Sequence, residues 1–468
     1  MPRKRLAAAF AALHWAALAL VWGRFAEVAA LRFPTDWDFL AYHFPGALAA
    51  YGLTTYTPEP RLAAVIQGFP PLPRAIEGGL VLLTGRFSAA CLLNLIGVGG
   101  LVAGSYWLYG RSFSVRWFLT CLLGIPLVVL HAISGYVDLF TACGVALALA
   151  SLGGLEAGAA RPRATAVLLV ASLTAAQLSK FQAWPIAALV AGFALWRLAA
   201  LACGGVVSRR AALGLVAALA LGLGAWPIRN LVQFHNPVYP VVFPLAPRLF
   251  PNAVVDADSG IYNMPSWLAD EPRPVRFVAS ALELNRFFDG DRFAWTLDQS
   301  AQADPVRSPH HRMGGWFWWT FLALSFGAAR ALRAGLVPRA ALAAFAPAVL
   351  AVAVLPQSHE LRYWLFIPLL LAVATARALA APELGSQRGM RAALVLAAAV
   401  VLVVVHPFAY DARAPAELAP EAAKAFWAAQ RAAPKPEPVR VCNVNPNGIF
   451  WAGPDFREFR VEACFGDP

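Results

Sequence analysis

Two carboxylates stand two positions apart in the stretch RFPTDWDFLAYHFPGA, residues 32–47. On a helix, side chains two positions apart point to different sides, so we expect only one of Asp36 and Asp38 to face a site. On a helix, Tyr42 and His43 would lie beside Asp38. A positioned carboxylate can act as a general base. The alternative is that both acids are solvated loop residues, one of which caps the following helix.

Two further ionisable residues interrupt apolar sequence. Asp138 lies in HAISGYVDLFTACGVALAL, and Lys180 lies in QLSKFQAWP. A charge inside a membrane span costs about 2.5–3.5 kcal/mol, and such a group usually faces a cavity or a partner. Asp138 is therefore a candidate functional acid and Lys180 a candidate binding residue. The alternatives are a neutral structural acid and a lysine that snorkels from a helix end.

The remaining candidates sit where apolar runs begin or end. They occur in LPRAIEGGLVLLTGR, WPIRNLVQFHNPVYP and PQSHELRYWLFIP, and they are Glu77, Arg229, Asn230, His359, Glu360, Arg362 and Tyr363. Arg229 could instead be an interfacial anchor. The pair formed by Glu360 and Arg362 could be purely structural.

A metal site is a weaker interpretation of the same residues. His43, Glu77 and His359 could in principle meet at one divalent cation, but none of them shows the close ligand spacing of a motif such as HExxH. The sequence also contains no P-loop, no GxGxxG after a strand and no GxSxG. We therefore predict no cofactor and keep a divalent metal as an alternative.

The elements that must position these residues are membrane helices. Of the 468 residues, 59% are hydrophobic and only 14% are charged, and the mean hydropathy is +0.59. Apolar runs long enough to approach the thickness of a bilayer predict eleven spans. They lie near residues 6–28, 88–109, 117–131, 134–153, 164–179, 182–200, 211–227, 314–331, 338–355, 362–380 and 391–408.

The distribution of charge predicts how these spans are oriented. If the N-terminus is cytoplasmic, the inner segments hold sixteen Lys and Arg residues and only two acids, Glu156 and Glu383. This asymmetry agrees with the positive-inside rule. The basic residues form short runs between spans rather than a continuous groove, so the net charge of +12 does not indicate nucleic-acid binding. Every candidate residue then falls on the outer side.

The outer segments complete the predicted organisation. A transmembrane domain covers residues 1–408, with outer loops at 32–87 and 228–312, and a small extracytoplasmic α+β domain covers 409–468. Segment 72–86 is too short to cross and contains Glu77, so we expect a juxtamembrane or re-entrant helix. In the tail, Cys442 and Cys464 either pair in an oxidising compartment or remain two free thiols.

Several of these motifs together resemble one family. TDWDFLAYHFPGA, FPPLPRAIEGGLVLLTG, SGYVDLF, LSKFQAWP, RNLVQFHNPVYP and ELRYWLFIP, in this order, are similar to the GT-C superfamily of membrane glycosyltransferases. The similarity is greatest to the bacterial branch of protein O-mannosyltransferases and the lipid A aminoarabinose transferase. It covers residues 1–408, and no single motif is specific by itself. One departure is His235, at a position where relatives commonly have glycine.

The resemblance implies an all-α polytopic fold with outer loops above a central cavity, in a bacterial inner membrane. It implies a polyprenyl-phosphate sugar as donor and a glycan, lipid or protein as acceptor. The family's catalytic acid maps onto Asp38, with Asp36 as second candidate, and its second functional acid maps onto Asp138. The other candidates named above would then bind substrate.

The expected reaction follows from such a donor. A lipid phosphate is a good leaving group that positive charge stabilises, and Lys180, Arg229 and Arg362 could supply that charge. One carboxylate can take the acceptor's proton as it attacks C1, which predicts inversion. The alternatives are an O-antigen ligase or polymerase that uses a diphosphate-linked donor, a transporter or lipid flippase, and a non-catalytic scaffold.

Overall fold

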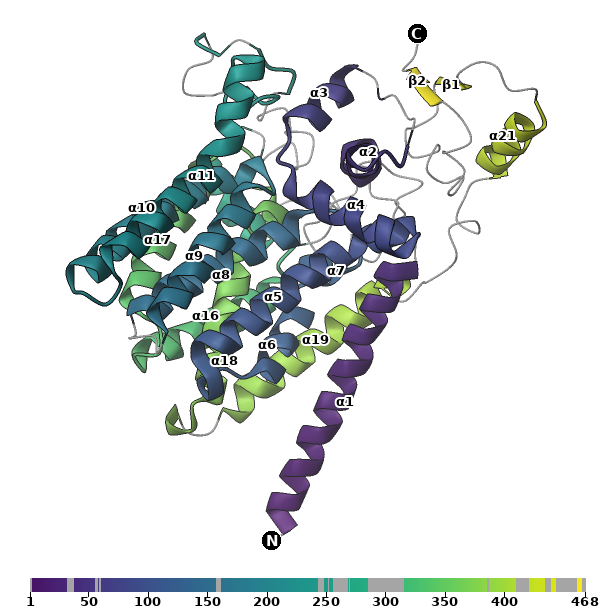
Figure 1. Ribbon diagram of the computed structural model, residues 1–468. Coiled ribbons are helices and arrows are strands. Elements are labelled where there is room, and N and C mark those ends of the chain that lie inside the picture. Colours follow the sequence, from purple (N-terminus) through teal and green to yellow (C-terminus); the bar gives the residue numbers. More distant parts are fainter. Residues whose placement is uncertain are drawn as a thin grey trace.

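In the computed structural model a helix lies in each of the eleven predicted spans (Figure 1). The structure describes residues 2–31, 38–54, 58, 60–156, 161–242, 248–250, 252–255, 268, 270–284, 315–384, 387–409, 421–433, 439–442 and 461–464. The helices are α1 (Pro2–Leu31), α5 (Leu92–Tyr109), α6 (Val115–Leu123) with α7 (Pro126–Ala132), α8 (Asp138–Glu156), α9 (Pro162–Gln177), α10 (Trp184–Cys203), α11 (Arg209–Phe234), α16 (Trp318–Arg333), α17 (Arg339–Val354), α18 (Phe366–Ala380) and α19 (Arg388–Ala409).

Not all of these helices are long enough to cross a membrane alone. Within the described residues, six helical segments have the length and apolar character of a span, namely 8–31, 87–112, 138–156, 181–203, 209–234 and 361–380. The pair α6 and α7, bent by 96°, would make a seventh if it counts as one broken span. The chain is therefore a multi-pass helical membrane protein, and the total of eleven crossings stays a prediction.

Helix α8 forms the centre of the bundle. Of its most apolar window, 83% of residues are buried, against 11% for α1 and for α11. It packs on α5, α9, α17 and α18. The close contact with α5 depends on Gly104, because a Cβ there would lie 2.5 Å from the Leu147 side chain. A polar residue at the start of α8 is therefore held by helices on several sides.

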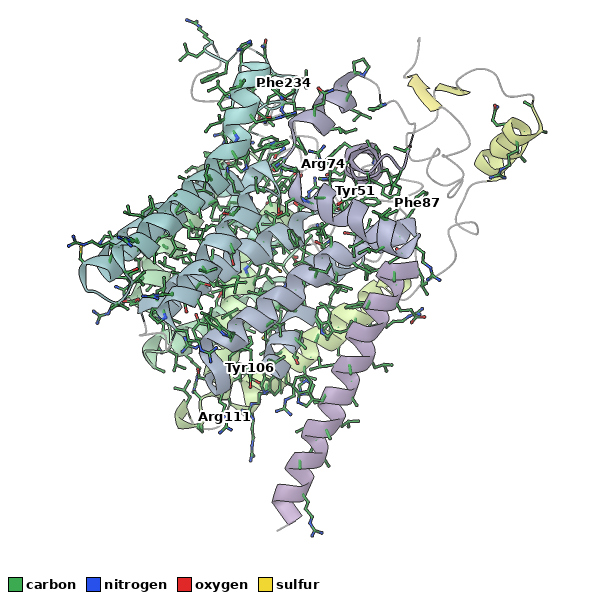
Figure 2. All side chains as sticks on the ribbon, viewed as in Figure 1. Tyr51, Arg74, Phe87, Tyr106, Arg111 and Phe234 are labelled. Carbon is green, nitrogen blue, oxygen red and sulfur yellow. The ribbon has the colours of Figure 1, made fainter. Side chains whose placement is uncertain are left out.

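Short helices cover one end of the bundle. After α1 come a π-helical turn η1 (Phe39–His43), α2 (Phe44–Ala50), α3 (Pro60–Gly68), α4 (Leu72–Thr84) and η2 (Phe87–Cys91). Helix α4 has 13 residues and packs on α2, and it is absent from the membrane-crossing candidates among the described residues. Side chains of this region, such as Arg74 and Tyr51, lie at the end opposite Tyr106 and Arg111 (Figure 2).

The second outer block begins later than the sequence predicts. Helix α11 continues through the expected boundary at residue 227, despite Pro227, and ends at Phe234. His235 follows in the left-handed conformation with φ 54°, which is a common helix C-terminal geometry and favours glycine. Within residues 228–312, the structure then describes α13 (Arg273–Leu282).

Short 3-10 turns connect several of the longer helices. They are η3 (Gly110–Ser112), η4 (Phe181–Ala183), η6 (Leu361–Trp364) and η7 (Pro382–Leu384). Turn η4 directly follows Lys180, and turn η6 carries Arg362 and Tyr363 at the entry to α18. These two turns therefore place three of the candidate residues at helix starts.

The C-terminal segment contains α21 (Glu421–Ala432) and a pair of strands, β1 (Val439–Cys442) and β2 (Val461–Cys464). The strands are parallel, and their register places Cys442 opposite Cys464. Adjacent strands lie about 4.7–4.9 Å apart, a separation that a disulfide can span. The pairing of these two cysteines stays a prediction.

Candidate active site

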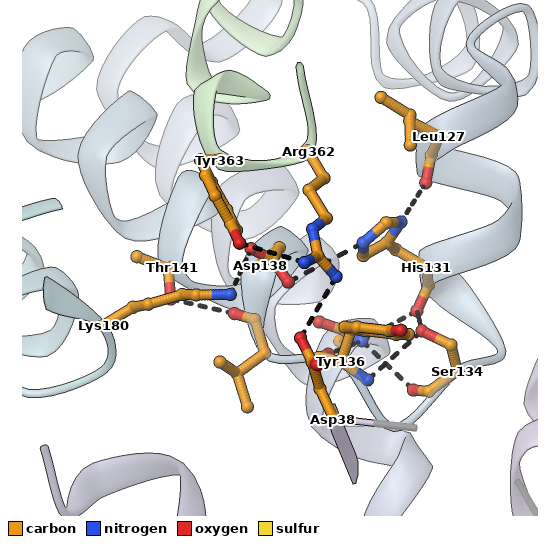
Figure 3. A network of polar contacts seen from close by, with 12 residues as sticks. Asp38, Leu127, His131, Ser134, Tyr136, Asp138, Thr141, Lys180, Arg362 and Tyr363 are labelled. Carbon is orange, nitrogen blue, oxygen red and sulfur yellow. Dashed lines mark hydrogen bonds and ion pairs between the residues drawn. The ribbon is translucent and has the colours of Figure 1, made fainter. Parts of the chain in front are cut away.

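A buried carboxylate at the start of α8 forms the centre of the candidate site. The Nζ of Lys180, just before η4, lies 2.6 Å from Asp138 Oδ1 (Figure 3). On the other side, His131 Nε2 lies 3.8 Å from Asp138 Oδ2. The side chain of Asp138 is fully buried and that of Lys180 is 4% exposed. Because a buried charge needs a partner, each of these two residues stabilises the charged state of the other.

The second carboxylate, Asp38, meets the same cluster through Arg362. The Nη1 of Arg362 lies 3.2 Å from Asp38 Oδ2, and its Nη2 donates to the Tyr363 hydroxyl at 2.9 Å. The Nε of Arg362 lies 3.7 Å from Glu360 Oε2. The side chains of Asp38 and Arg362 are each 15% exposed. Asp38 is thus more accessible than Asp138.

Aromatic rings join the two ion pairs. The Arg362 guanidinium lies 4.9 Å from the ring centres of both Tyr136 and Tyr363. The Lys180 ammonium lies 4.5 Å from the ring of Tyr363. Such cation–π contacts are worth about 0.5–2 kcal/mol. Tyr363 therefore holds the two cations next to each other.

Tyr42 and His43 lie at the edge of this cluster. Their rings are 4.5 Å apart, and Phe69 packs against both. Burial and the positive charge of Lys180 keep the pKa of His43 well below its usual value, so this imidazole is neutral at neutral pH. Phe69 also packs edge-on against Phe181, next to Lys180. The aromatic contacts thus connect the first outer block to the turn that carries the lysine.

A side chain in the first turn of α5 holds the segment that leads into α8. Asn94 is fully buried. Its Nδ2 donates to the carbonyl oxygens of His131 at 2.7 Å, Ser134 at 3.3 Å and Tyr136 at 2.5 Å. Its Oδ1 accepts from the backbone N–H of Phe140 at 3.0 Å. One amide therefore fixes the segment that presents His131, Tyr136 and Asp138.

Arg229 and Asn230 contact backbone carbonyl groups rather than the two carboxylates of the cluster, and the prediction that Arg229 supplies charge to the substrate phosphate stays a prediction. Arg229 donates to the Gln67 carbonyl, and Asn230 donates to the Gly68 and Tyr239 carbonyls. These contacts attach the end of α3 to the end of α11. Both residues thus support the outer segments rather than the ion pairs.

Glu77 also lies apart from the ion pairs. It is fully buried, and neither carboxylate oxygen has a hydrogen-bond partner among the described residues. Burial raises the pKa of Glu77 to about 8, against the opposing charge of Arg74. Arg74 itself donates to the carbonyls of Ile66 and Phe69. Glu77 is therefore mostly protonated at neutral pH.

The metal alternative depended on three residues that do not come together. In the part of the chain that the structure describes, no group of three or more His, Cys, Asp and Glu side chains is arranged to hold a metal ion. His43 and Glu77 have different neighbours, and His359 lies 3.8 Å from Glu360. His43, Glu77 and His359 thus do not form such a group among the described residues, and the use of a divalent metal stays an alternative prediction.

Six of the predicted site residues lie together in the cluster. They are Asp38, Asp138, Lys180, Glu360, Arg362 and Tyr363. Asp36 lies outside the described residues. Sequence reasoning missed His131, Tyr136 and Asn94. Asn94 gave a usable signal, because a lone amide within an apolar span needs a buried partner.

Comparisons with known proteins agree with this architecture. No family model matches the chain, and no curated protein matches it. A crystal structure of ArnT from Cupriavidus metallidurans, bound to undecaprenyl phosphate, aligns with 97% of this chain and 86% of its own, with a TM-score of 0.54 and 13% identity. An oligosaccharyltransferase from Archaeoglobus fulgidus, in complex with Zn and sulfate, aligns with 95% of this chain and 62% of its own, with a TM-score of 0.43 and 14% identity. The chain therefore shares its overall fold with ArnT.

Proposed function

We propose that this chain is an inverting glycosyltransferase that moves a hexose or pentose from a polyprenyl-phosphate donor to an acceptor hydroxyl. The observation that carries the proposal is the cluster itself. One partly exposed carboxylate, Asp38, lies 3.2 Å from the Arg362 guanidinium, and Lys180 lies close by across the Tyr363 ring. A base and two cations are the groups that transfer from a phosphate-linked sugar requires.

Asp38 is better suited than Asp138 to act as the base. A general base must approach the hydroxyl from which it takes a proton. Asp38 is 15% exposed, whereas Asp138 is fully buried between Lys180 and His131. We therefore assign proton transfer to Asp38 and assign to Asp138 the task of holding Lys180. Asp36 remains the second candidate for the base.

Lys180 and Arg362 retain donors for a phosphate group. An ammonium has three N–H donors and a guanidinium has five. Lys180 uses one on Asp138, and Arg362 uses Nη1 on Asp38 and Nη2 on Tyr363. Their remaining donors can bind phosphate oxygens and stabilise the charge that develops as the sugar leaves.

The reaction then proceeds in one displacement. The acceptor oxygen forms a bond to C1 of the sugar while the bond from C1 to the phosphate oxygen breaks. The acceptor proton goes to Asp38, and the electron pair of the broken bond stays on the polyprenyl phosphate. Attack opposite the leaving group inverts the anomeric carbon.

The location of the site supports a lipid-borne substrate. Asp38 directly precedes η1, one of the short helices that cover one end of the bundle (Figure 1), and Arg362 lies 3.2 Å from Asp38 (Figure 3). The positive-inside rule supports placing this end on the outer face, with a cytoplasmic N-terminus and an extracytoplasmic C-terminus. In the bacterial inner membrane that we propose, this is the periplasmic face. A donor with a polyprenyl chain could present its phosphate there while the chain remains in the bilayer.

The donor class can be tested directly with the purified chain in lipid nanodiscs. Labelled sugars are supplied on undecaprenyl monophosphate or on undecaprenyl diphosphate, and transfer to a mixture of envelope acceptors is measured. We expect transfer from the monophosphate donor and none from the protein carrying Asp38→Asn. Transfer only from the diphosphate donor would favour the ligase or polymerase alternative. Movement of labelled lipid between leaflets without transfer would favour a flippase.

A further inference from the structure

A cavity lies at the end of the bundle opposite the carboxylate cluster. Its volume is about 250 Å³, and its walls come from α16, α17 and α18, with Ala150 of α8. Ala150 lies twelve residues along α8 from Asp138, which corresponds to about 18 Å at 1.5 Å per residue. The cavity is therefore distinct from the candidate active site.

The packing of the helices explains why the cavity exists. Helix α16 packs mainly on α18 and α19, whereas α17 packs on α8, α10 and α13. These two helices follow each other in the chain but pack on different neighbours. A space therefore remains between them, and residues of α18 form part of its wall. Leu332 of α16 and Leu342 of α17 both line the cavity and are 44% and 38% exposed. The cavity therefore opens between them toward the surroundings of the bundle, which for a membrane protein are lipid chains.

A single charged side chain, Arg377, is among the described residues that line this apolar cavity. Arg377 is fixed in position, because it donates to the Leu336 carbonyl and its guanidinium lies 4.1 Å from the ring centre of Tyr109. The Tyr109 hydroxyl in turn donates to the Ala150 carbonyl at 2.9 Å. The buried Nε of Arg377 has no hydrogen-bond partner among the described residues. A rigid guanidinium with a spare donor is suited to a phosphate oxygen.

Several arginines are close in sequence to the residues that line the cavity. Arg330 and Arg333 lie in the last turn of α16, and Arg339 is the first residue of α17. The acid nearby, Glu156, accepts from the backbone N–H of Ala340 at the start of α17. The balance of charge at this end therefore favours an anionic ligand over a zwitterionic one.

We propose that this cavity binds an anionic phospholipid from the leaflet at the arginine-rich end. One acyl chain occupies the apolar space between α16 and α17, and the phosphate group contacts Arg377. The apolar walls account for the chain, and the arginines account for the preference for negative charge. The proposal concerns a site separate from glycosyl transfer and does not depend on it.

The chain also contains a matched control cavity. A second apolar cavity of about 270 Å³ lies between α16 and α19 and is lined by Trp319, Leu322, Phe326, Met390 and Ala393 among others. No charged residue lines it within the described part of the chain. If apolar volume alone attracted lipid, the two cavities would bind lipids of any headgroup equally.

The test is native mass spectrometry of the delipidated full chain, titrated with phosphatidylglycerol or phosphatidylethanolamine that carry the same acyl chains. We expect one phosphatidylglycerol to bind at least ~5-fold more tightly than phosphatidylethanolamine, given the usual attraction of an arginine for anionic lipid. Arg377→Gln should abolish the preference, and Arg377→Lys should keep most of it. Ala374→Phe, which fills the cavity and keeps the arginine, should remove the bound lipid.

Two controls and a competitor make the result decisive. Ala393→Phe in the control cavity and Arg61→Gln on the exposed surface of α3 should leave the binding of phosphatidylglycerol unchanged within about twofold. Undecaprenyl phosphate at equal concentration should not displace the bound phospholipid. Equal binding of the two phospholipids, unchanged binding in Ala374→Phe, or displacement by undecaprenyl phosphate would each overturn the proposal.

Discussion

The two carboxylates of the cluster differ in burial, and this difference gives them different tasks. Asp138 is fully buried and its partner Lys180 is 4% exposed. Asp38 and Arg362 are each 15% exposed, and Arg362 also contacts Tyr363 and Glu360. Loss of the Asp38 charge therefore leaves Arg362 with partners, whereas loss of the Asp138 charge leaves a buried lysine without its ion pair.

The first prediction concerns Asp138. We expect Asp138→Asn to reduce stability by about 3–5 kcal/mol, because it leaves the buried Lys180 ammonium uncompensated. The double variant Asp138→Asn with Lys180→Met should recover most of this loss but not the transfer activity, since Lys180 is proposed to bind phosphate. Thermal unfolding in detergent gives the stability. A single variant as stable as the unchanged protein would contradict the buried ion pair.

The second prediction concerns the pH dependence contributed by Glu77. Burial raises its pKa in the folded protein to about 8, well above the usual value of a glutamate near 4.3. Between these two pH values the unfolded state has lost the proton that the folded state keeps, so stability falls as pH rises and levels off above about 8. Glu77→Gln should therefore raise the melting temperature more at pH 8 than at pH 5.

The exposed Glu27, paired with Arg24 on α1, provides the control for this measurement. Glu27→Gln should change the melting temperature little at either pH, because an exposed ion pair contributes at most about 1 kcal/mol. If the difference between Glu77→Gln and the unchanged protein does not grow with pH, Glu77 is not kept protonated by burial.

At the scale of elements, the site depends on the connection between α7 and α8. His131 lies in the last turn of α7, Tyr136 lies in the connection, and Asp138 is the first residue of α8. Asn94 of α5 binds three carbonyl groups of the connection and the N–H of Phe140. A buried carbonyl that loses its donor costs about 1–3 kcal/mol. The geometry of the acid therefore depends on an amide in a neighbouring helix.

The third prediction follows from this dependence. Asn94→Leu has a similar volume but no donor, so it should lower stability by more than about 2 kcal/mol and reduce transfer as well. Ser105→Ala is the matched control, because Ser105 is a buried polar residue of the same helix whose hydroxyl has no partner among the described residues. Equal melting temperatures for Asn94→Leu and Ser105→Ala would contradict the role given to Asn94.

The sequence predicts the long apolar helices better than it predicts the residues at which they end. Each of the eleven apolar runs in the sequence contains a helix in the structure, because contact with lipid selects for hydrophobic residues along a whole helix. Residue 227 was a poor boundary for α11, since the helix continues through Pro227 to His235. The left-handed conformation of His235 is one that glycine adopts more easily than histidine.

The site was predictable where one charge stood alone in apolar sequence, and unpredictable where contacts joined distant segments. Asp138 and Lys180 each stood out, and the structure pairs them. Arg229 carries a similar signal, yet it binds the Gln67 carbonyl at the end of α3. Sequence spacing cannot distinguish these outcomes, because the difference depends on which helix end lies next to which.

At the scale of the whole molecule, the two ends of the bundle have different chemistry. Ion pairs between acids and bases gather at the end covered by α2, α3 and α4 (Figures 1 and 3). At the opposite end, Arg377 lines the cavity between α16 and α17, and three more arginines lie at the end of α16 and the start of α17. A lipid-linked sugar at one end and a phospholipid at the other would thus contact different helices, and variants at one end should leave the other unchanged.

The most direct test of the proposed reaction measures sugar transfer by purified Asp38→Asn at equal amounts of folded protein, with Asp36→Asn beside it. We expect Asp38→Asn to lose at least ~100-fold in transfer rate, the usual contribution of a general base, while its melting temperature stays close to that of the unchanged protein. Asp36→Asn should lose much less. A folded Asp38→Asn variant that transfers sugar within a few-fold of the unchanged rate would show that Asp38 is not the base.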